Sequence, residues 1–311
     1  MKLFHIIKAQ QFNRRLLDRI FKVAAEMEKI NLAGGSNILK GKIMATIFYE
    51  PSTRTRLSFE AAMAKLGGEI ISTESAKEFS SAAKGESLED TIRIIGNYAD
   101  IIVLRHYESG AAERAAKVSP VPIINAGDGP GQHPTQALLD IYTIYKEIGH
   151  IDGISIAMVG DLAYSRTVRS LAYLLTKYQD IKMYFVAPDV VQMRDDIKDY
   201  LLKHKVFFAE ESNLEKVASK VDVIYQTRIQ KERFGENIED YEKAKDKYII
   251  DKHILKIMQK DAIIMHPLPR VTEISPEVDT DRRAAYFRQA QNGLYIRMAL
   301  LKMILLDKAS G

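Results

Sequence analysis

The chain has 311 residues, of which 46% are hydrophobic, and a formal net charge of +4. This length suggests two domains or one large α/β unit, and the charge forms no basic block of the kind that binds nucleic acid or membranes. Cysteine is absent, which excludes disulfides, thiolate metal sites and a cysteine nucleophile. The apolar stretch near residue 1 is too short for a signal peptide, and no run approaches the ~18 apolar residues of a membrane span. We therefore expect a soluble cytoplasmic protein.

Short apolar runs alternate with amphipathic stretches along the first half. Apolar residues at helical spacing predict a helix over residues 12–30, then a strand from Ile43 and a helix that ends at Gly67-Gly68. Further strands are expected at 70–71, 101–104 and 122–126. A capping box at Ser87 and Asp90 and a proline at 134 predict two more helix starts.

The second half continues the same alternation. Strands are predicted at 154–159, 182–187, 206–209, 223–226 and 262–265. Helices are predicted at 167–177, 196–204, 214–220, 252–259 and 284–306. Strands alternating with helices indicate mostly parallel sheets covered on both faces. We expect an α/β protein with two doubly wound domains, each with a sheet of four or five strands, and a hinge near 127–134 or 149–153.

The segment between the first predicted strand and its helix concentrates hydroxyl and guanidinium groups. It reads Ser52-Thr53-Arg54-Thr55-Arg56. A strand that leads directly into a helix points the unpaired N–H groups of that helix at one place, which favours an anion. The alternative is a simple N-cap, a common role for serine or threonine before a helix. Two arginines in the first turn oppose the helix dipole, so we expect a negatively charged group to offset them, which favours the anion site over the simple cap.

Other candidate residues follow the remaining strands, because ligands of open parallel sheets bind beyond the C-terminal strand ends. These candidates are Arg105, Gln132, His133, 161–166, Arg228 and 266–270. One arginine in such a place is commonly a surface ion pair, but four of them (54, 105, 166 and 228) favour a ligand with several anionic groups. His133, at a helix start, would stay neutral and polarise a carbonyl, unless it is an ordinary hydrogen-bonded loop histidine.

Several common signatures are missing. The turn at Gly160-Asp161 follows a strand but lacks the G-x-G-x-x-G pattern, which disfavours a nicotinamide-dependent dehydrogenase. The acidic residues between 189 and 199 show no metal-ligand spacing, and no Walker A or Ser-His-Asp signature is present.

Taken together, the segments 48–56, 104–106, 131–136 and 158–161 resemble the signatures of the aspartate and ornithine carbamoyltransferases. The resemblance covers essentially the whole chain. Segments 228–233 and 266–270 resemble the aspartate members, whereas ornithine members carry His-Cys-Leu-Pro at the latter place, which a chain without cysteine lacks. A dicarboxylate substrate also fits arginines in the second domain better than cationic ornithine does.

The resemblance implies a carbamoyl-phosphate-binding domain at 1–133, completed by 285–311, and an aspartate-binding domain at 134–284, with the active site in the cleft between them. It implies transfer of the carbamoyl group to L-aspartate in pyrimidine biosynthesis, with no cofactor and no metal. The alternatives are another carbamoyltransferase of the ornithine type and a catalytically inactive phosphate-binding or scaffold protein.

The resemblance also implies roles for single residues. Phosphate would be held by Ser52, Thr53, Arg54, Thr55 and Arg105. The carbonyl would be polarised by Thr55, Arg105 and His133. The carbamoyl amino group would be oriented by Gln136 and the backbone carbonyls of Pro267 and Leu268. L-Aspartate would be bound by Lys84, Arg166, Arg228 and Gln230. Domain closure would pair Glu50 with Arg166 and Arg233.

A homotrimer with shared active sites is implied as well, in which Ser80 and Lys84 enter the site of the neighbouring subunit. The adjacent Ser81 leaves open which serine is presented. Whether regulatory chains or a dihydroorotase bind also stays open. An inactive relative would be expected to lose Arg105, His133 or Lys84, and all three are present.

Overall fold

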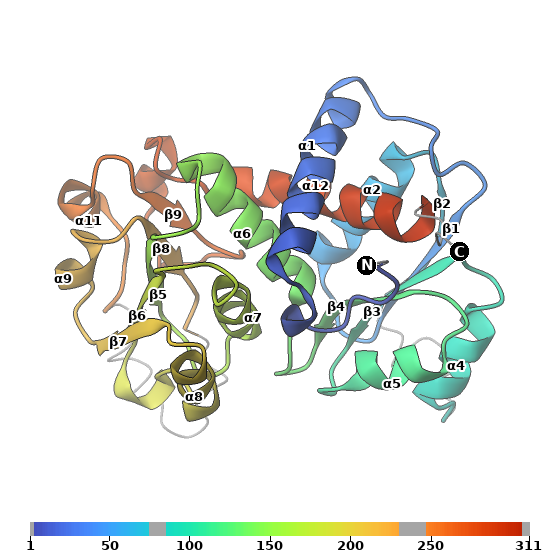
Figure 1. Cartoon of the computed structure of the whole chain (residues 1–311), viewed down its shortest axis with the longest axis horizontal. Helices are drawn as coiled ribbons and strands as arrows, with labels where there is room; N and C mark the ends of the chain where they lie inside the picture. Colours follow the sequence, from blue (N-terminus) through green and yellow to red (C-terminus); the bar gives the residue numbers. More distant parts are fainter. Residues whose placement is uncertain (1–2, 75–84, 230–246, 307–311) are drawn as a thin grey trace. The chain divides into compact units, whose positions relative to one another are not determined.

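The computed structural model describes residues 3–74, 85–229 and 247–306. The chain forms two compact units, one of Met1–Leu139 with Gln291–Gly311 and the other of Asp140–Ala290. It leaves the first unit within helix α6 (Pro134–Ile148) and returns within α12 (Tyr286–Leu306), as the colours in Figure 1 allow the reader to follow. No helix in the described ranges is long and apolar enough to span a membrane.

The first unit is built on a four-stranded parallel sheet. Its strands are β1 (Ile43–Phe48), β2 (Glu69–Glu74), β3 (Ile101–His106) and β4 (Ile123–Asp128). The order is β2-β1-β3-β4, so the chain adds β2 on one side of β1 and then returns to add β3 on the other. The ends of β1 and β3 therefore form a topological switch point, where such sheets bind ligands.

Helices cover both faces of this sheet. Its helices are η1 (Ala9–Gln11), α1 (Arg14–Leu32), α2 (Thr53–Lys65), α4 (Leu88–Ile95) and α5 (Ala111–Val118). Alternate residues of β1, such as Ala45 and Ile47, pack in one core with Ile92 of α4 and Ala115 of α5. Thr46, which points to the other face, donates a hydrogen bond to Glu60 of α2 (3.0 Å). Figure 1 shows α2 on the side opposite α4 and α5.

The second unit contains a five-stranded parallel sheet. Its strands are β5 (Ser155–Val159), β6 (Lys182–Val186), β7 (Phe207–Glu211), β8 (Val223–Gln226) and β9 (Ile263–Met265). The order β7-β6-β5-β8-β9 places a second switch point between β5 and β8. The predicted fold class, with two parallel sheets of four or five strands, is confirmed.

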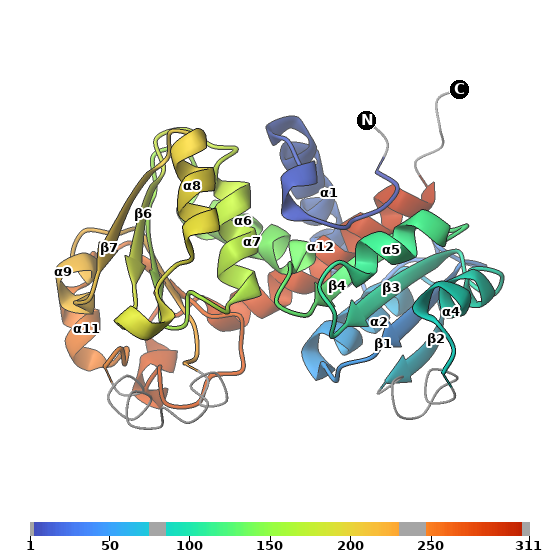
Figure 2. The same cartoon turned by 90° about the horizontal axis from the view of Figure 1, so that it is seen from below.

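Short helices flank the second sheet. They are α7 (Arg166–Leu175), η3 (Asp189–Val191), α8 (Asp195–Lys203), α9 (Leu214–Ala218), α11 (Lys252–Ile257) and η5 (Pro276–Thr280). Figure 2 shows α9 and α11 on one face of the strands and α7 and α8 on the other.

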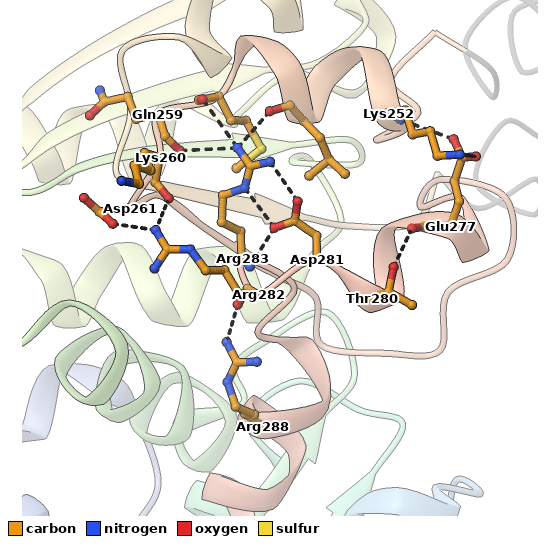
Figure 3. Close-up of polar contacts among 12 residues, drawn as sticks. Lys252, Gln259, Lys260, Asp261, Glu277, Thr280, Asp281, Arg282, Arg283 and Arg288 are labelled. Atoms are coloured by element: carbon orange, nitrogen blue, oxygen red, sulfur yellow. Dashed lines mark hydrogen bonds and ion pairs between the residues drawn. The ribbon is translucent and has the colours of Figure 1, made fainter.

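An arginine cluster fixes the segment that leads from η5 into α12 (Figure 3). Arg283 donates hydrogen bonds to the carbonyl of Leu255 in α11 (2.8 Å) and to the carboxylate of Asp281 (2.8 Å). It thereby supplies a donor to a helix carbonyl that has no partner within α11. Hydrogen bonds from Arg283 lower the pKa of Asp281 to about 2. Arg288 donates to the carbonyl of Arg282 (2.9 Å), so the start of α12 is held in the same cluster.

Candidate functional site

At the first switch point, the hydroxyl-rich segment begins α2 as the sequence predicts. Ser52 occupies the N-cap position, yet its side chain forms no capping hydrogen bond. Thr55 is buried in the first turn, and no acidic residue lies there. The plain N-cap interpretation therefore fails for Ser52, and the first N–H groups of α2 remain available to an anion.

The two arginines of this turn have different surroundings. Arg56 forms ion pairs with Glu60 (3.2 Å) and with Glu74 of β2 (2.9 Å). Arg54 is exposed and forms no ion pair within the described ranges. The negative groups that offset Arg56 are therefore carboxylates of the protein itself. Of the two arginines, Arg54 remains the predicted phosphate contact.

Arg105 stands at the end of β3, across the switch point from α2. The register pairs it with Phe48, and its carbonyl accepts a hydrogen bond from the Tyr49 N–H (2.9 Å). Its guanidinium lies 3.5 Å from the carboxylate of Glu50 and donates to the carbonyl of Ala126 (3.3 Å). This contact orients Arg105 beside the residues that lead into α2.

His133 and Gln136 are both buried at the start of α6. Thr135 Oγ1 lies 3.4 Å from His133 Nδ1. The preceding loop is shaped by the buried Asp128, whose carboxylate accepts the backbone N–H of Gln132 (2.9 Å). The Gln132 side chain accepts the N–H of Ala9 (2.7 Å), so this strand-end candidate has a structural role.

At the second switch point, Arg166 is the first residue of α7 and Arg228 follows β8. The two turns touch, because the Thr227 N–H donates to the carbonyl of Val159 (2.8 Å). Gly160, which directly follows β5, has φ +108°, and a Cβ there would lie 2.3 Å from the Thr227 carbonyl oxygen. Glycine is required at this turn for both reasons.

The segment 266–270 follows β9, next to β8. Pro267 and Leu268 are half-buried, and Leu268 has a positive φ of 54°. The charge of Arg228 is one of the smaller effects that lower the pKa of His266, after burial as the main cause, which indicates that Arg228 lies near this segment. Arg166, Arg228 and the Pro267-Leu268 carbonyls therefore belong to one edge of the second sheet.

Four predicted site residues, Ser80, Lys84, Gln230 and Arg233, lie outside the described ranges, as does Ser81. The pairing of Glu50 with Arg166 or Arg233 likewise stays a prediction. Within the described part, no group of three or more acidic or histidine side chains is arranged to hold a metal ion.

Comparisons with known proteins cover both units. The model of the carbamoyl-P binding domain of aspartate/ornithine carbamoyltransferase matches residues 5–146, and that of the Asp/Orn binding domain matches 152–304. The chloroplastic aspartate carbamoyltransferase of Oryza sativa is 65% identical over 314 residues, covering 99% of this chain and 86% of that protein. The catalytic subunit from Methanocaldococcus jannaschii is 51% identical over 304 residues, covering 97% and 98%.

Solved structures of aspartate transcarbamoylases have the same fold as this chain. That of the M. jannaschii catalytic subunit has a TM-score of 0.92 at 50% identity and covers 99% of this chain and 100% of its own. Aspartate transcarbamoylase from Trypanosoma cruzi, in complex with carbamoyl phosphate and aspartate, has a TM-score of 0.92 at 42% identity, covering 98% and 97%. The chain belongs to the aspartate/ornithine carbamoyltransferase family.

Proposed function

We propose that this protein is an aspartate carbamoyltransferase, which transfers the carbamoyl group of carbamoyl phosphate to the amine of L-aspartate. The observation that carries this proposal is the placement of arginines at both switch points, Arg54 and Arg105 in one sheet and Arg166 and Arg228 in the other. The aspartate carbamoyltransferases at 51–65% identity support the same substrates.

The first sheet binds carbamoyl phosphate. The N–H groups at the start of α2, with the Ser52 and Thr53 hydroxyls, hold the phosphate, and Arg54 neutralises its charge. Arg105, oriented by Glu50, bridges the phosphate and the carbonyl oxygen. Gln136 and the carbonyls of residues 267 and 268 accept hydrogen bonds from the carbamoyl amino group.

The reaction is an attack of the aspartate amine on the carbamoyl carbon. Thr55, Arg105 and His133 donate to the carbonyl oxygen and stabilise the negative charge that develops on it in the tetrahedral intermediate. The C–O bond to phosphate then breaks, and the leaving phosphate takes the amine proton. Positioning and charge stabilisation by the protein suffice for these reaction steps, without a cofactor.

The second sheet binds L-aspartate through its two carboxylates. Arg166 and Arg228 suit this task because the planar guanidinium binds a carboxylate through two parallel hydrogen bonds. Gln230 and Lys84 complete this half of the site in the proposal. The proposal assigns residues 1–133 and 285–311 to the carbamoyl-phosphate-binding domain and residues 134–284 to the aspartate-binding domain.

A homotrimer with shared sites is also proposed, supported by the edge of the first sheet. The edge strand β2 exposes Ile71 (38%), and α2 exposes Leu57 (50%). The outer edge of β2 pairs with no other strand of the described residues, and exposed apolar side chains accompany it. The segment with Ser80 and Lys84 directly follows β2, which suits delivery of these residues to a neighbour. We also propose that the protein acts in pyrimidine biosynthesis in the cytoplasm.

Phosphate release from carbamoyl phosphate, measured with L-aspartate or L-ornithine as the acceptor, tests this function. We expect turnover with aspartate and little above background with ornithine, because a cationic side chain is repelled by the arginines of the second sheet. Faster turnover with ornithine would make the protein an ornithine-type transferase. A folded protein that is inactive with both amines would be a binding or scaffold protein instead.

A further inference from the structure

A buried histidine with no role so far, His266, follows β9 directly before the two predicted carbamoyl contacts. Its side chain is 1% exposed, and Nε2 lies 2.8 Å from the carboxylate of Glu273. Its Nδ1 accepts the backbone N–H of Leu268 (2.7 Å), and its own N–H donates to the Gln289 side chain (2.8 Å). His266 therefore connects the turn at 267–268 to Glu273 and to α12 through hydrogen bonds.

These contacts assign one tautomer to His266. A backbone N–H can only donate, so Nδ1 must be the acceptor, and the ring proton must be on Nε2, where it is donated to Glu273. Burial lowers the pKa of His266, which keeps the ring neutral. Burial alone would raise the pKa of Glu273, but hydrogen bonds from His266 and the Val271 N–H hold it below its usual range.

Gln289 is itself held by a buried carboxylate. Its amide donates to Asp140 (2.7 Å), whose other oxygen accepts the hydroxyl of Tyr225 (2.8 Å). Gln289 and Asp140 are both buried, at 1% and 0% exposure. Because the Gln289 amide nitrogen donates to Asp140, its oxygen is directed to the His266 N–H. Asp140, Gln289, His266 and Glu273 form the His266 network.

The backbone next to Gln289 is anchored to β9 as well. The Ile264 N–H donates to the carbonyl of Arg283 (2.7 Å), and the Ala285 N–H donates to the carbonyl of Ile264 (2.9 Å). The arginine cluster of Figure 3 also holds this segment. These contacts hold the backbone beside Gln289, whose side-chain oxygen accepts the His266 N–H.

We propose that Glu273 and Gln289 are positioning residues that act through His266 to fix the backbone carbonyls of Pro267 and Leu268 toward the carbamoyl amino group. This inference rests on the proposed function. Leu268 adopts a positive φ, which is unfavourable for a residue with a side chain, so the turn needs contacts that hold it. The Leu268 N–H···His266 bond is such a contact.

The substitution Glu273→Gln tests the role of this carboxylate. Glutamine keeps the size and the acceptor for the backbone N–H groups but presents an NH2 group to Nε2. The ring must then move its proton to Nδ1, facing the Leu268 N–H, or lose the bond to residue 273. We expect the KM for carbamoyl phosphate to rise about tenfold or more, as for a buried donor left without its acceptor. The KM for aspartate should stay within about twofold of wild type, because Arg166 and Arg228 are untouched.

The KM values separate positioning from a loss of folded protein. Fewer folded molecules would lower the apparent kcat and leave both KM values unchanged. Glu277→Gln is the matched control, since Glu277 lies on the same segment but pairs with the exposed Lys252 (3.2 Å). It should leave both KM values at the wild-type level.

Gln289→Met provides a second variant of similar size, in case Glu273→Gln does not fold. It removes the acceptor of the His266 N–H and should raise the same KM. Wild-type turnover with an unchanged KM for carbamoyl phosphate in a folded Glu273→Gln or Gln289→Met protein would overturn the positioning role alone. A wild-type protein without turnover would instead overturn the proposed function.

Discussion

The variant Arg54→Ala is expected to turn over about a hundredfold more slowly than wild type, the usual cost of losing one preorganised contact to a developing charge. Arg54 lies in the first turn of α2 without an ion pair in the described ranges, so its removal breaks no internal contact of that kind. The melting temperature should therefore change little while phosphate release falls. Steady-state kinetics and a thermal melt on the same preparation make this measurement.

Arg56→Ala is the matched control, two residues further along the same helix. Because Arg56 pairs with Glu60 and Glu74, its loss should lower the melting temperature more than Arg54→Ala does. Its effect on turnover should be much smaller than that of Arg54→Ala. Unchanged turnover in Arg54→Ala would mean that the phosphate binds elsewhere.

Arg228→Ala is expected to raise the KM for L-aspartate about tenfold to a hundredfold, since a hydrogen bond to a charged group contributes about 1.5–3 kcal/mol. Arg228 follows β8 at the second switch point, whereas the phosphate contacts belong to the first sheet. The KM for carbamoyl phosphate should therefore stay near wild type. Varying each substrate at saturation of the other separates the two constants.

Arg169→Ala controls for the loss of an arginine from the same unit. Arg169 lies on α7 and pairs with the half-exposed Asp196, and a pair of that kind contributes only about 0–1 kcal/mol. Both KM values should stay close to wild type. If Arg228→Ala gave the same result as Arg169→Ala, aspartate would have to bind without Arg228.

Much of the fold follows from the periodicity of the sequence. The strands at 154–159 and 223–226 are apolar runs of buried-strand length, and the structure places β5 and β8 there. Because ligands bind beyond strand ends, Arg105 and Arg228 are identified as candidates before the strand order is known. The order itself comes only from the structure, and it shows that both residues lie at switch points.

Three features required the structure, each for a physical reason. The helix α5 (Ala111–Val118) is not predicted, because its buried residues are all alanines, which give little apolar contrast. Arg56 cannot be distinguished from Arg54 by sequence, because its partner Glu74 comes from a different strand. Gln289 is not among the predicted site residues, although a polar residue in a buried apolar helix is itself a signal, since it requires a partner.

The central claim is that the anion sites of the two sheets bind parts of one pair of substrates. N-(phosphonacetyl)-L-aspartate, which the T. cruzi relative binds in a solved structure, carries a phosphonate and two carboxylates in one molecule. Calorimetric titration of wild type, Arg54→Ala and Arg228→Ala with this compound tests the claim most directly. We expect one molecule bound per wild-type chain and about tenfold or greater weakening in each variant. Wild-type affinity in either variant would contradict the claim.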